Sequence, residues 1–250
     1  MIFSIILCVH EFHPYLSESI KSILEQDFDD YEVIVVANNC SDELFSYLEE
    51  VCAGDNVVLR RTHIGQLCFN LNYAINIARG DYIIRMDSDD VCYTDRLKIC
   101  YGYISLDYDI VAFSADYIDE SGLIIGERIL TEGDLCRKLI IKNPIIHPAA
   151  MIKRSFLLKM RGYSGGFQSE DYDLWLRASR DKNLRYKFSE QKVIQYRISD
   201  GQSKGNLLPY CETSGYYMRE LTLKFKFKHL LGLVISVFKR YLFGLNGFKK

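Results

Sequence analysis

The sequence predicts an α/β protein in which a mostly parallel, mixed sheet is flanked by helices. Four short apolar runs rich in Val, Ile and Tyr alternate with segments whose apolar residues recur every three or four positions, as in successive β-α-β units. The 250 residues are 48% hydrophobic and 26% charged, which supplies a sizeable core and excludes disordered and collagen-like chains.

Strands and helices alternate strictly in the first half. Strands are expected at 4–9, 32–37, 56–61 and 82–86. Pro14 suits the first turn of the helix after the first strand, and Ser41 suits the N-cap of the next helix. A third helix, from about residue 67, is expected to stop at Gly80. Helical crossovers of this length join parallel strands with right-handed connections.

The second half is less regular. Strands are expected at 109–116, 123–129, 149–153 and 192–198, and a helix at 171–180. Gly, Ser, Asn and Pro cluster at 199–209 and indicate the one plausible boundary. We therefore expect a domain over 1–205, with halves 1–95 and 96–205, followed by an amphipathic helical tail over 206–250.

The tail differs in charge from the rest of the chain. Residues 219–250 carry eight Lys and Arg but a single acid, whereas the remaining residues have a net charge of −9. So acidic a body argues against nucleic-acid binding. The apolar run 230–238 is too short to span a bilayer but long enough to lie in its interface, so residues 212–250 are expected to contact a membrane. The alternative is a helix packed on the body with its lysines in solvent.

The compartment follows from the cysteines and the N-terminus. The eight cysteines include no C-x-x-C pair, and a chain of this size needs no disulfides to fold. The first residues show no basic segment of the kind that opens a signal peptide, and no apolar stretch reaches the roughly 20 residues of a membrane span. We expect reduced thiols and a cytoplasmic location.

An acidic cluster follows the fourth expected strand. Asp87, Asp89 and Asp90 lie within four residues, and side chains two apart on an extended chain point to the same side. Ligands of open α/β sheets bind at the carboxyl ends of the strands. Two carboxylates there favour Mg²⁺ or Mn²⁺, which bind oxygen ligands together with substrate phosphates. The alternative is a solvated turn that caps a helix beginning near Asp95.

A second acidic cluster follows the glycine-bearing loop 162–167. Glu170 and Asp171 precede an expected helix. One interpretation is a general base presented by a mobile loop. The other is a pair of acids that only complement the helix dipole.

Several motifs, spread over about residues 3–203, carry a family resemblance. They are Ser4-Ile5-Ile6-Leu7, Glu32-Val33-Ile34-Val35-Val36, Ala78-Arg79-Gly80-Asp81-Tyr82-Ile83, Arg85-Met86-Asp87-Ser88-Asp89-Asp90 and Glu170-Asp171-x-x-Leu174-Trp175-x-Arg177. Together they resemble family 2 glycosyltransferases of the GT-A fold. The resemblance implies an inverting enzyme that moves a sugar from a nucleotide donor, often UDP-activated, to an acceptor hydroxyl. Residues 1–95 would bind the nucleotide sugar and residues 96–205 the acceptor.

The resemblance also implies roles for single residues. Donor-binding positions are Asn38, Asn39, Gly65, Asn72, Arg85, Asp87, Ser88 and Asp89, of which Asp87 and Asp89 would hold Mn²⁺ or Mg²⁺. Asp171 matches the catalytic base, with Glu170 beside it, and His147, Trp175 and Asp90 fall on the acceptor side. Two positions depart from the family pattern. Asn38 replaces an Asp that contacts the base, and Ser199 replaces a His that approaches the metal.

The resemblance further implies a bacterial surface-polysaccharide role in O-antigen or capsule synthesis. The expected reaction transfers a hexose from a UDP-sugar to an undecaprenyl-diphosphate-linked sugar or a saccharide and forms a β-linkage. It would take place at the cytoplasmic face of the inner membrane. Two other functions are possible for a chain of this pattern. A sugar-nucleotide nucleotidyltransferase usually has a glycine-rich phosphate loop where this chain has residues 9–14, which contain no glycine. A non-catalytic sugar-binding module would be expected to lose the carboxylates, and all are present.

Overall fold

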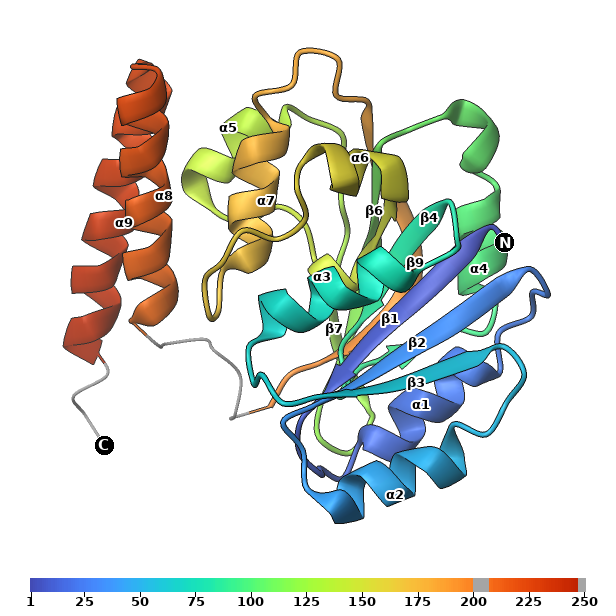
Figure 1. Ribbon diagram of the computed structural model, residues 1–250. Coiled ribbons are helices and arrows are strands. Elements are labelled where there is room, and N and C mark those ends of the chain that lie inside the picture. Colours follow the sequence, from blue (N-terminus) through green and yellow to red (C-terminus); the bar gives the residue numbers. More distant parts are fainter. Residues whose placement is uncertain (200–206, 247–250) are drawn as a thin grey trace.

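The computed structural model describes residues 1–199 and 207–246, and a mixed sheet with helices on both faces forms its centre (Figure 1). In this described part the sheet has nine strands in the order β3-β2-β1-β4-β8-β6-β9-β5, and β7 pairs with β6. The strands are β1 (Phe3–Val9), β2 (Tyr31–Asn38), β3 (Val57–Thr62), β4 (Tyr82–Met86), β5 (Val91–Cys92), β6 (Ile110–Ile118), β7 (Ile124–Arg128), β8 (Ala150–Lys153) and β9 (Tyr186–Arg197). The helices are α1 (Leu16–Leu24), α2 (Asp42–Val51), α3 (Leu67–Ile77), α4 (Arg96–Tyr101), α5 (Leu135–Ile141), α6 (Arg154–Lys159), α7 (Glu170–Ala178), α8 (Leu208–Leu223) and α9 (Phe227–Asn246).

The sheet separates two hydrophobic cores. α1, α2 and α4 pack on one face, where Leu16, Leu44 and Leu97 are buried with the side chains of β1 and β2. α3, α5, α6 and α7 cover the other face, where Leu71 and Trp175 are buried. Figure 1 shows α1 and α2 on one side of the sheet and α3 crossing the other.

The predicted alternation of the first half is confirmed. β1, β2, β3 and β4 form parallel pairs, and α1, α2 and α3 connect them. β1 and β2 are buried almost throughout, which explains why their sequences are continuous apolar runs without polar alternation. The side chain of Ser41 accepts from the backbone N–H of Leu44, so the expected N-cap is present.

Gly80 does not end the third helix, because α3 already stops at Ile77. Its N–H donates to Ser4 Oγ at 2.9 Å, and a Cβ at this position would lie 2.6 Å from the backbone of Phe3 and Ser4. Ser4 in turn donates to the buried carboxylate of Glu32, which also pairs with Arg79 at 2.9 Å. The glycine is therefore needed for close packing against β1.

The second half departs from the expectation in three ways. The sheet there is evenly mixed, since β8 runs antiparallel to β4 and β6 while β9 runs parallel to β6. β9 begins at Tyr186, six residues before its predicted start, and its register against β6 shifts near Ser114. α5 and α6 were not expected, because seven and six residues make too few turns to show helical periodicity.

The C-terminal region forms two helices where one amphipathic tail was expected. α8 and α9 lie side by side as a helical hairpin (the α8–α9 hairpin, residues 208–246), shown in red at the left of Figure 1. α8 packs on α7 and α9 packs on α5. The predicted boundary at 205/206 lies outside the described residues. None of the helices within 1–199 and 207–246 is long and apolar enough to cross a membrane.

Candidate active site

The acidic segment after β4 is held in place by side chains from distant elements. Arg197, at the end of β9, donates from Nε to the carbonyl oxygen of Asp89 at 2.8 Å. Ser19 of α1 donates to the carbonyl oxygen of Asp87 at 3.1 Å. His13 lies 2.9 Å from Ser88 Oγ, although sequence analysis gave this histidine no role at the site. Its position follows from the turn that starts α1, which no motif marks.

Asp87 and Asp89 have the electrostatics expected of cation ligands. Burial raises the pKa of both carboxyl groups. Asp87 is paired with Arg85 at 2.7 Å, whereas Asp89 forms no ion pair with any described residue. No three His, Cys, Asp or Glu side chains in the described ranges converge as a ready metal site. A divalent cation therefore fits these two carboxylates only if a ligand or water completes its oxygen shell.

Two residues expected on the acceptor side are buried in the interior, and these expectations are corrected. Asp90 has no exposed surface, and its Oδ1 accepts from the backbone N–H of Arg197 at 2.9 Å. Trp175 is likewise fully buried and packs edge-on against the ring of His147, with centroids 5.6 Å apart. Asp90 thus anchors the end of β9, and Trp175 supports a histidine from behind.

Arg85 joins three predicted site residues. Its Nε contacts Asp87 at 2.7 Å, and its Nη1 contacts Glu170 at 2.7 Å and His147 Nδ1 at 2.6 Å. Arginine only donates, so Nδ1 of His147 accepts and the ring proton sits on Nε2, which donates to Tyr163 Oη at 2.7 Å. Burial, then the charge of Arg85, holds the pKa of His147 well below its usual value, so the ring is neutral.

Asp171 has a different environment from its neighbour Glu170. Its Oδ2 accepts from the side-chain amide of Asn143 at 2.6 Å, and its Oδ1 accepts from the backbone N–H of Tyr172 at 2.6 Å. Burial and the nearby Glu170 charge raise the pKa of Asp171 to about 7. A carboxyl group that titrates near neutrality is suited to accept a proton from a hydroxyl group.

Asp87 and Asp171 line one polar pocket of about 260 Å³. The pocket also holds residues that the motifs did not identify: Tyr117, Arg128, Asn143, Gln168 and Tyr196. Arg128, on β7, donates to the carbonyl oxygen of Asn143 at 2.8 Å and so positions the amide that bonds Asp171. The antiparallel pairing of β7 with β6 brings this arginine to the site, a tertiary placement that the two expected strands alone do not specify.

Two of the predicted nucleotide-binding positions, Asn39 and Gly65, lie next to each other. Asn39 has a left-handed backbone (φ 50°) directly after β2, and a Cβ on Gly65 would lie 3.2 Å from its side-chain nitrogen. Asn38, at the end of β2, is almost buried. Asn72 has a structural role instead. Its amide exchanges two hydrogen bonds with the backbone of Tyr163, at 2.8 and 2.9 Å, and so holds the turn behind the site.

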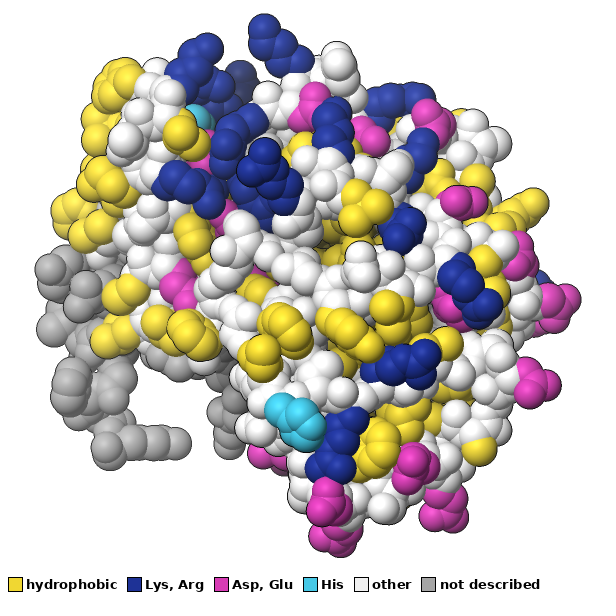
Figure 2. Space-filling model, in the orientation of Figure 1, with side chains coloured by type: hydrophobic (Ala, Val, Ile, Leu, Met, Phe, Trp, Pro, Cys, Tyr) yellow, Lys and Arg dark blue, Asp and Glu magenta, His cyan; other side chains and the backbone are white. Residues whose placement is uncertain are grey.

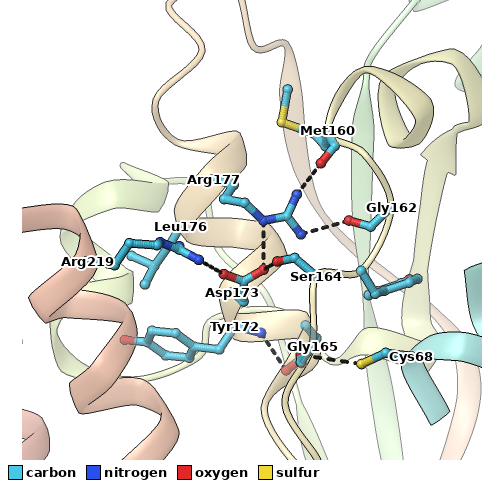
Figure 3. Close-up of polar contacts among 12 residues, drawn as sticks. Cys68, Met160, Gly162, Ser164, Gly165, Tyr172, Asp173, Leu176, Arg177 and Arg219 are labelled. Atoms are coloured by element: carbon cyan, nitrogen blue, oxygen red, sulfur yellow. Dashed lines mark hydrogen bonds and ion pairs between the residues drawn. The ribbon is translucent and has the colours of Figure 1, made fainter. Parts of the chain in front are cut away.

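The loop expected to be mobile is fastened at both ends. Figure 3 shows Asp173, fully buried on α7, bonded to Arg177, Arg219 and Ser164. Arg177 also donates to the carbonyl oxygen of Gly162 at 2.7 Å. At the other end, Glu212 of α8 accepts from the backbone N–H of Phe167 at 2.7 Å. The α8–α9 hairpin therefore supports the start of the helix that carries Asp171.

Comparisons with known proteins give the family and the fold. Residues 4–165 match the family model described as glycosyl transferase family 2. The chain is 38% identical over 227 residues to the O-antigen biosynthesis glycosyltransferase WbnJ of Escherichia coli, covering 88% of this chain and 89% of that protein. It is 25% identical over 188 residues to the Escherichia coli UDP-Gal:alpha-D-GlcNAc-diphosphoundecaprenol beta-1,3-galactosyltransferase, covering 70% and 67%. Among solved structures, TarS of S. aureus (residues 1–349) in complex with UDP-GlcNAc superposes with a TM-score of 0.75 at 19% identity, covering 94% of this chain and 71% of that one.

Proposed function

The chain belongs to glycosyltransferase family 2 and has the GT-A fold, and from that premise we propose an inverting hexosyltransferase that uses a UDP-sugar donor. The observation that carries the proposal is the polar pocket shared by Asp87 and Asp171. One carboxylate follows β4 at the expected donor position, and the other has a pKa of about 7. A donor and an acceptor hydroxyl would meet between them.

On the donor side, the chain's own residues would bind the nucleotide and its charge. Asn38, Asn39 and Gly65 would hold the base, since an amide can both donate to and accept from a base edge. Asp87 and Asp89 would hold Mn²⁺ or Mg²⁺, for which the uncompensated carboxylate of Asp89 leaves a ligand. When bound, the cation supplies positive charge that neutralises the leaving diphosphate. Ser199 stands where relatives have a histidine ligand, so diphosphate oxygens and water would complete the shell.

On the acceptor side, Asp171 would remove the proton of the attacking hydroxyl group. Asn143 fixes its carboxylate by the 2.6 Å hydrogen bond, and the Arg85–Glu170 ion pair keeps Glu170 turned away from that task. Attack on an α-linked sugar from the face opposite the diphosphate gives a β-glycoside. Holding donor and hydroxyl in this geometry supplies much of the remaining rate enhancement.

The test of the donor site is UDP release by the purified enzyme. The wild-type enzyme should release UDP from a UDP-sugar in the presence of Mn²⁺ or Mg²⁺. It should lose this activity in excess EDTA. Asp87→Asn and Asp89→Asn should each abolish metal-supported UDP binding measured by calorimetry. Asp55→Asn, at an exposed carboxylate away from the site, is the control and should bind UDP as wild type does. Full activity in EDTA would contradict the metal assignment.

For the acceptor we propose a lipid-diphosphate-linked sugar of a bacterial surface polysaccharide such as O-antigen or capsule. Support comes from the relatives: one is named for O-antigen biosynthesis and another for a diphosphoundecaprenol acceptor. The enzyme would act at the cytoplasmic face of the inner membrane. A saccharide acceptor without lipid is the alternative, and a panel of the two acceptor types distinguishes them.

We further propose that the α8–α9 hairpin attaches the enzyme reversibly to this membrane. Phe227, Leu231, Val234 and Phe238 are 41–73% exposed, and their spacing of four, three and four residues puts them on one face of α9. Figure 2 shows hydrophobic side chains along the margin formed by the hairpin. Lys224, Lys226 and Lys228 lie at the same end as Phe227, and each basic group near an anionic surface contributes about 1 kcal/mol.

Flotation with anionic liposomes tests the attachment. Phe227→Asp and Phe238→Asp should each reduce binding at low salt, because they put a negative charge into the apolar face. Leu123→Asp is the matched control, since Leu123 is 67% exposed on the β6–β7 turn. Equal flotation of all three variants and wild type would rule out α9 as the contact.

A further inference from the structure

A second pocket, of about 290 Å³, lies between α5, the start of α7 and the α8–α9 hairpin. It shares Asn143, Gln168 and Asp171 with the polar pocket. Asp171 therefore faces two adjoining spaces, one toward the donor carboxylates and one toward the hairpin. A substrate that places a hydroxyl group at Asp171 from the acceptor side has this second pocket available for the rest of its structure.

The wall of the second pocket is mostly apolar. Ile140 and Ile141 line it from α5, and Ile235 lines it from α9. Ile141 is 62% exposed, so the apolar surface continues to the outside of the molecule. An elongated apolar ligand could enter here and leave its remainder at the surface of the hairpin.

Two cations lie at this pocket without an acidic partner. Lys142 and Lys239 both line it, and neither forms an ion pair with a carboxylate of the described residues. Lys239 Nζ donates to the carbonyl oxygen of Ile141, one residue before Lys142. Burial and the charge of Lys142 lower the pKa of Lys239, as expected of two ammonium groups near each other. An anion between them would relieve this repulsion.

Gln168 supplies an independent sign of a missing ligand. Its Oε1 is buried, borders both pockets, and has no hydrogen-bond partner among the described residues. Buried polar atoms are rarely left unpaired in native proteins. A hydroxyl-bearing ligand at the junction of the pockets would donate to this oxygen.

We infer that the second pocket binds the lipid-diphosphate part of the acceptor. Lys142 and Lys239 bind the diphosphate, the isoleucine wall takes the first prenyl units, and the attached sugar reaches the junction at Gln168 and Asp171. The diphosphate and the sugar are neighbours in the acceptor, and their proposed binding residues are neighbours in the sequence. Lys142 directly precedes Asn143, which donates a hydrogen bond to Asp171. The inference rests on the proposed transferase function and names the pocket and the residues that bind the acceptor's diphosphate and lipid.

The test is a binding experiment without donor or metal, so that it does not depend on catalysis. Farnesyl diphosphate, inorganic pyrophosphate and farnesol are titrated into the full chain in EDTA. Farnesyl diphosphate should bind tighter than either fragment. Lys142→Gln and Lys239→Gln should each weaken it by about tenfold or more, the usual effect of losing a hydrogen bond to a charged group. Lys182→Gln, at an exposed lysine elsewhere, should leave it unchanged.

A second variant separates the prenyl contacts from the diphosphate contacts. Ile141→Ser changes an exposed side chain at the mouth without adding charge beside the two lysines, and should weaken farnesyl diphosphate but not pyrophosphate. Farnesyl diphosphate that binds no better than pyrophosphate, or lysine variants that bind like wild type, would overturn the inference. Intact farnesyl diphosphate binding in a protein that never releases UDP would instead count against the proposed function.

Discussion

Asn143 donates its side-chain amide to the carboxylate of Asp171 across 2.6 Å. The hydrogen bond favours the ionised carboxylate and so lowers the pKa of Asp171, while burial and the charge of Glu170 raise it. The balance places the pKa at about 7. The residue that orients the proposed base therefore also lowers its pKa, against the larger opposing effects of burial and Glu170.

The pH profile of the reaction should show this balance. We predict that kcat/KM is low at acid pH, where Asp171 is protonated, and rises as pH increases through about 7. Asn143→Ala removes the contact that favours the carboxylate, so the acid limb should move to higher pH. Initial rates over about pH 5.5 to 9 measure the shift. An acid limb that stays in place in Asn143→Ala would mean that another group is titrating.

Substitutions of the two neighbouring acids, Asp171 and Glu170, should have different effects. Asp171→Asn is predicted to lower turnover by about 10² to 10⁴ while metal-supported UDP affinity stays near that of wild type. The reason is that Asp171 contacts Asn143 and the pocket but none of the donor carboxylates. Single-turnover rates and UDP calorimetry measure the two quantities.

Glu170→Gln is predicted to lower stability, because it breaks a buried ion pair with Arg85. Arg85 keeps its ion pair with Asp87 at 2.7 Å, so no uncompensated charge is left and we expect a loss of about 1–3 kcal/mol in the free energy of unfolding. Urea denaturation followed by circular dichroism measures the loss. A stable but inactive Glu170→Gln, together with an active Asp171→Asn, would exchange the two roles.

Asp173 should be a main stabilising contact of the hairpin. Its buried carboxylate is bonded to Arg177 at 2.7 Å and to Arg219 of α8, so Asp173→Leu leaves both guanidinium groups without it. We predict a loss of about 3–5 kcal/mol in the free energy of unfolding. Asp27→Ala is the control, because Asp27 and its partner Lys98 are 70% and 55% exposed and such surface pairs contribute about 0–1 kcal/mol. Similar losses in both variants would contradict the prediction.

Two glycines should respond to alanine with opposite signs. Gly80→Ala puts a Cβ 2.6 Å from the backbone of Phe3 and Ser4, and we predict that it lowers the free energy of unfolding by about 1–3 kcal/mol. Gly215→Ala lies inside α8 with no atom near the new Cβ, so it should raise stability by about 0.5–1 kcal/mol. Thermal melts of both variants decide whether packing or helix propensity dominates at each position.

The sequence predicted the fold of the first half well because each strand there is an apolar run followed by a helix with its own periodicity. It could not show that Asp87 and Asp90, three residues apart, face different surroundings. Only the backbone N–H of Arg197, 107 residues away from Asp90, determines that Asp90 points inward. Trp175 belongs to a recognisable motif, yet its packing against His147 is a tertiary contact that motif spacing does not contain.

The C-terminal region shows a further limit of sequence analysis. An amphipathic pattern predicts an apolar face but not what covers it. α9 has two different sides. Gly232 and Ser236 are buried on the side toward α8, while Leu231 and Phe238 remain exposed on the other side. The alternative of a packed helix thus describes the side of α9 toward α8, and the proposed membrane contact concerns the exposed side.

The pairing of Asp173 with Arg219 also bears on how the protein is synthesised. Arg219 leaves the ribosome 46 residues after Asp173, so a nascent chain must hold that carboxylate with Arg177 and Ser164 until α8 has emerged. Until then Trp175 and the other apolar side chains around α7 lack one covering layer, a condition that favours aggregation of partly folded chains. A premature stop codon just ahead of α8 would therefore yield a chain that contains every proposed catalytic carboxylate but is a substrate for chaperones and proteases.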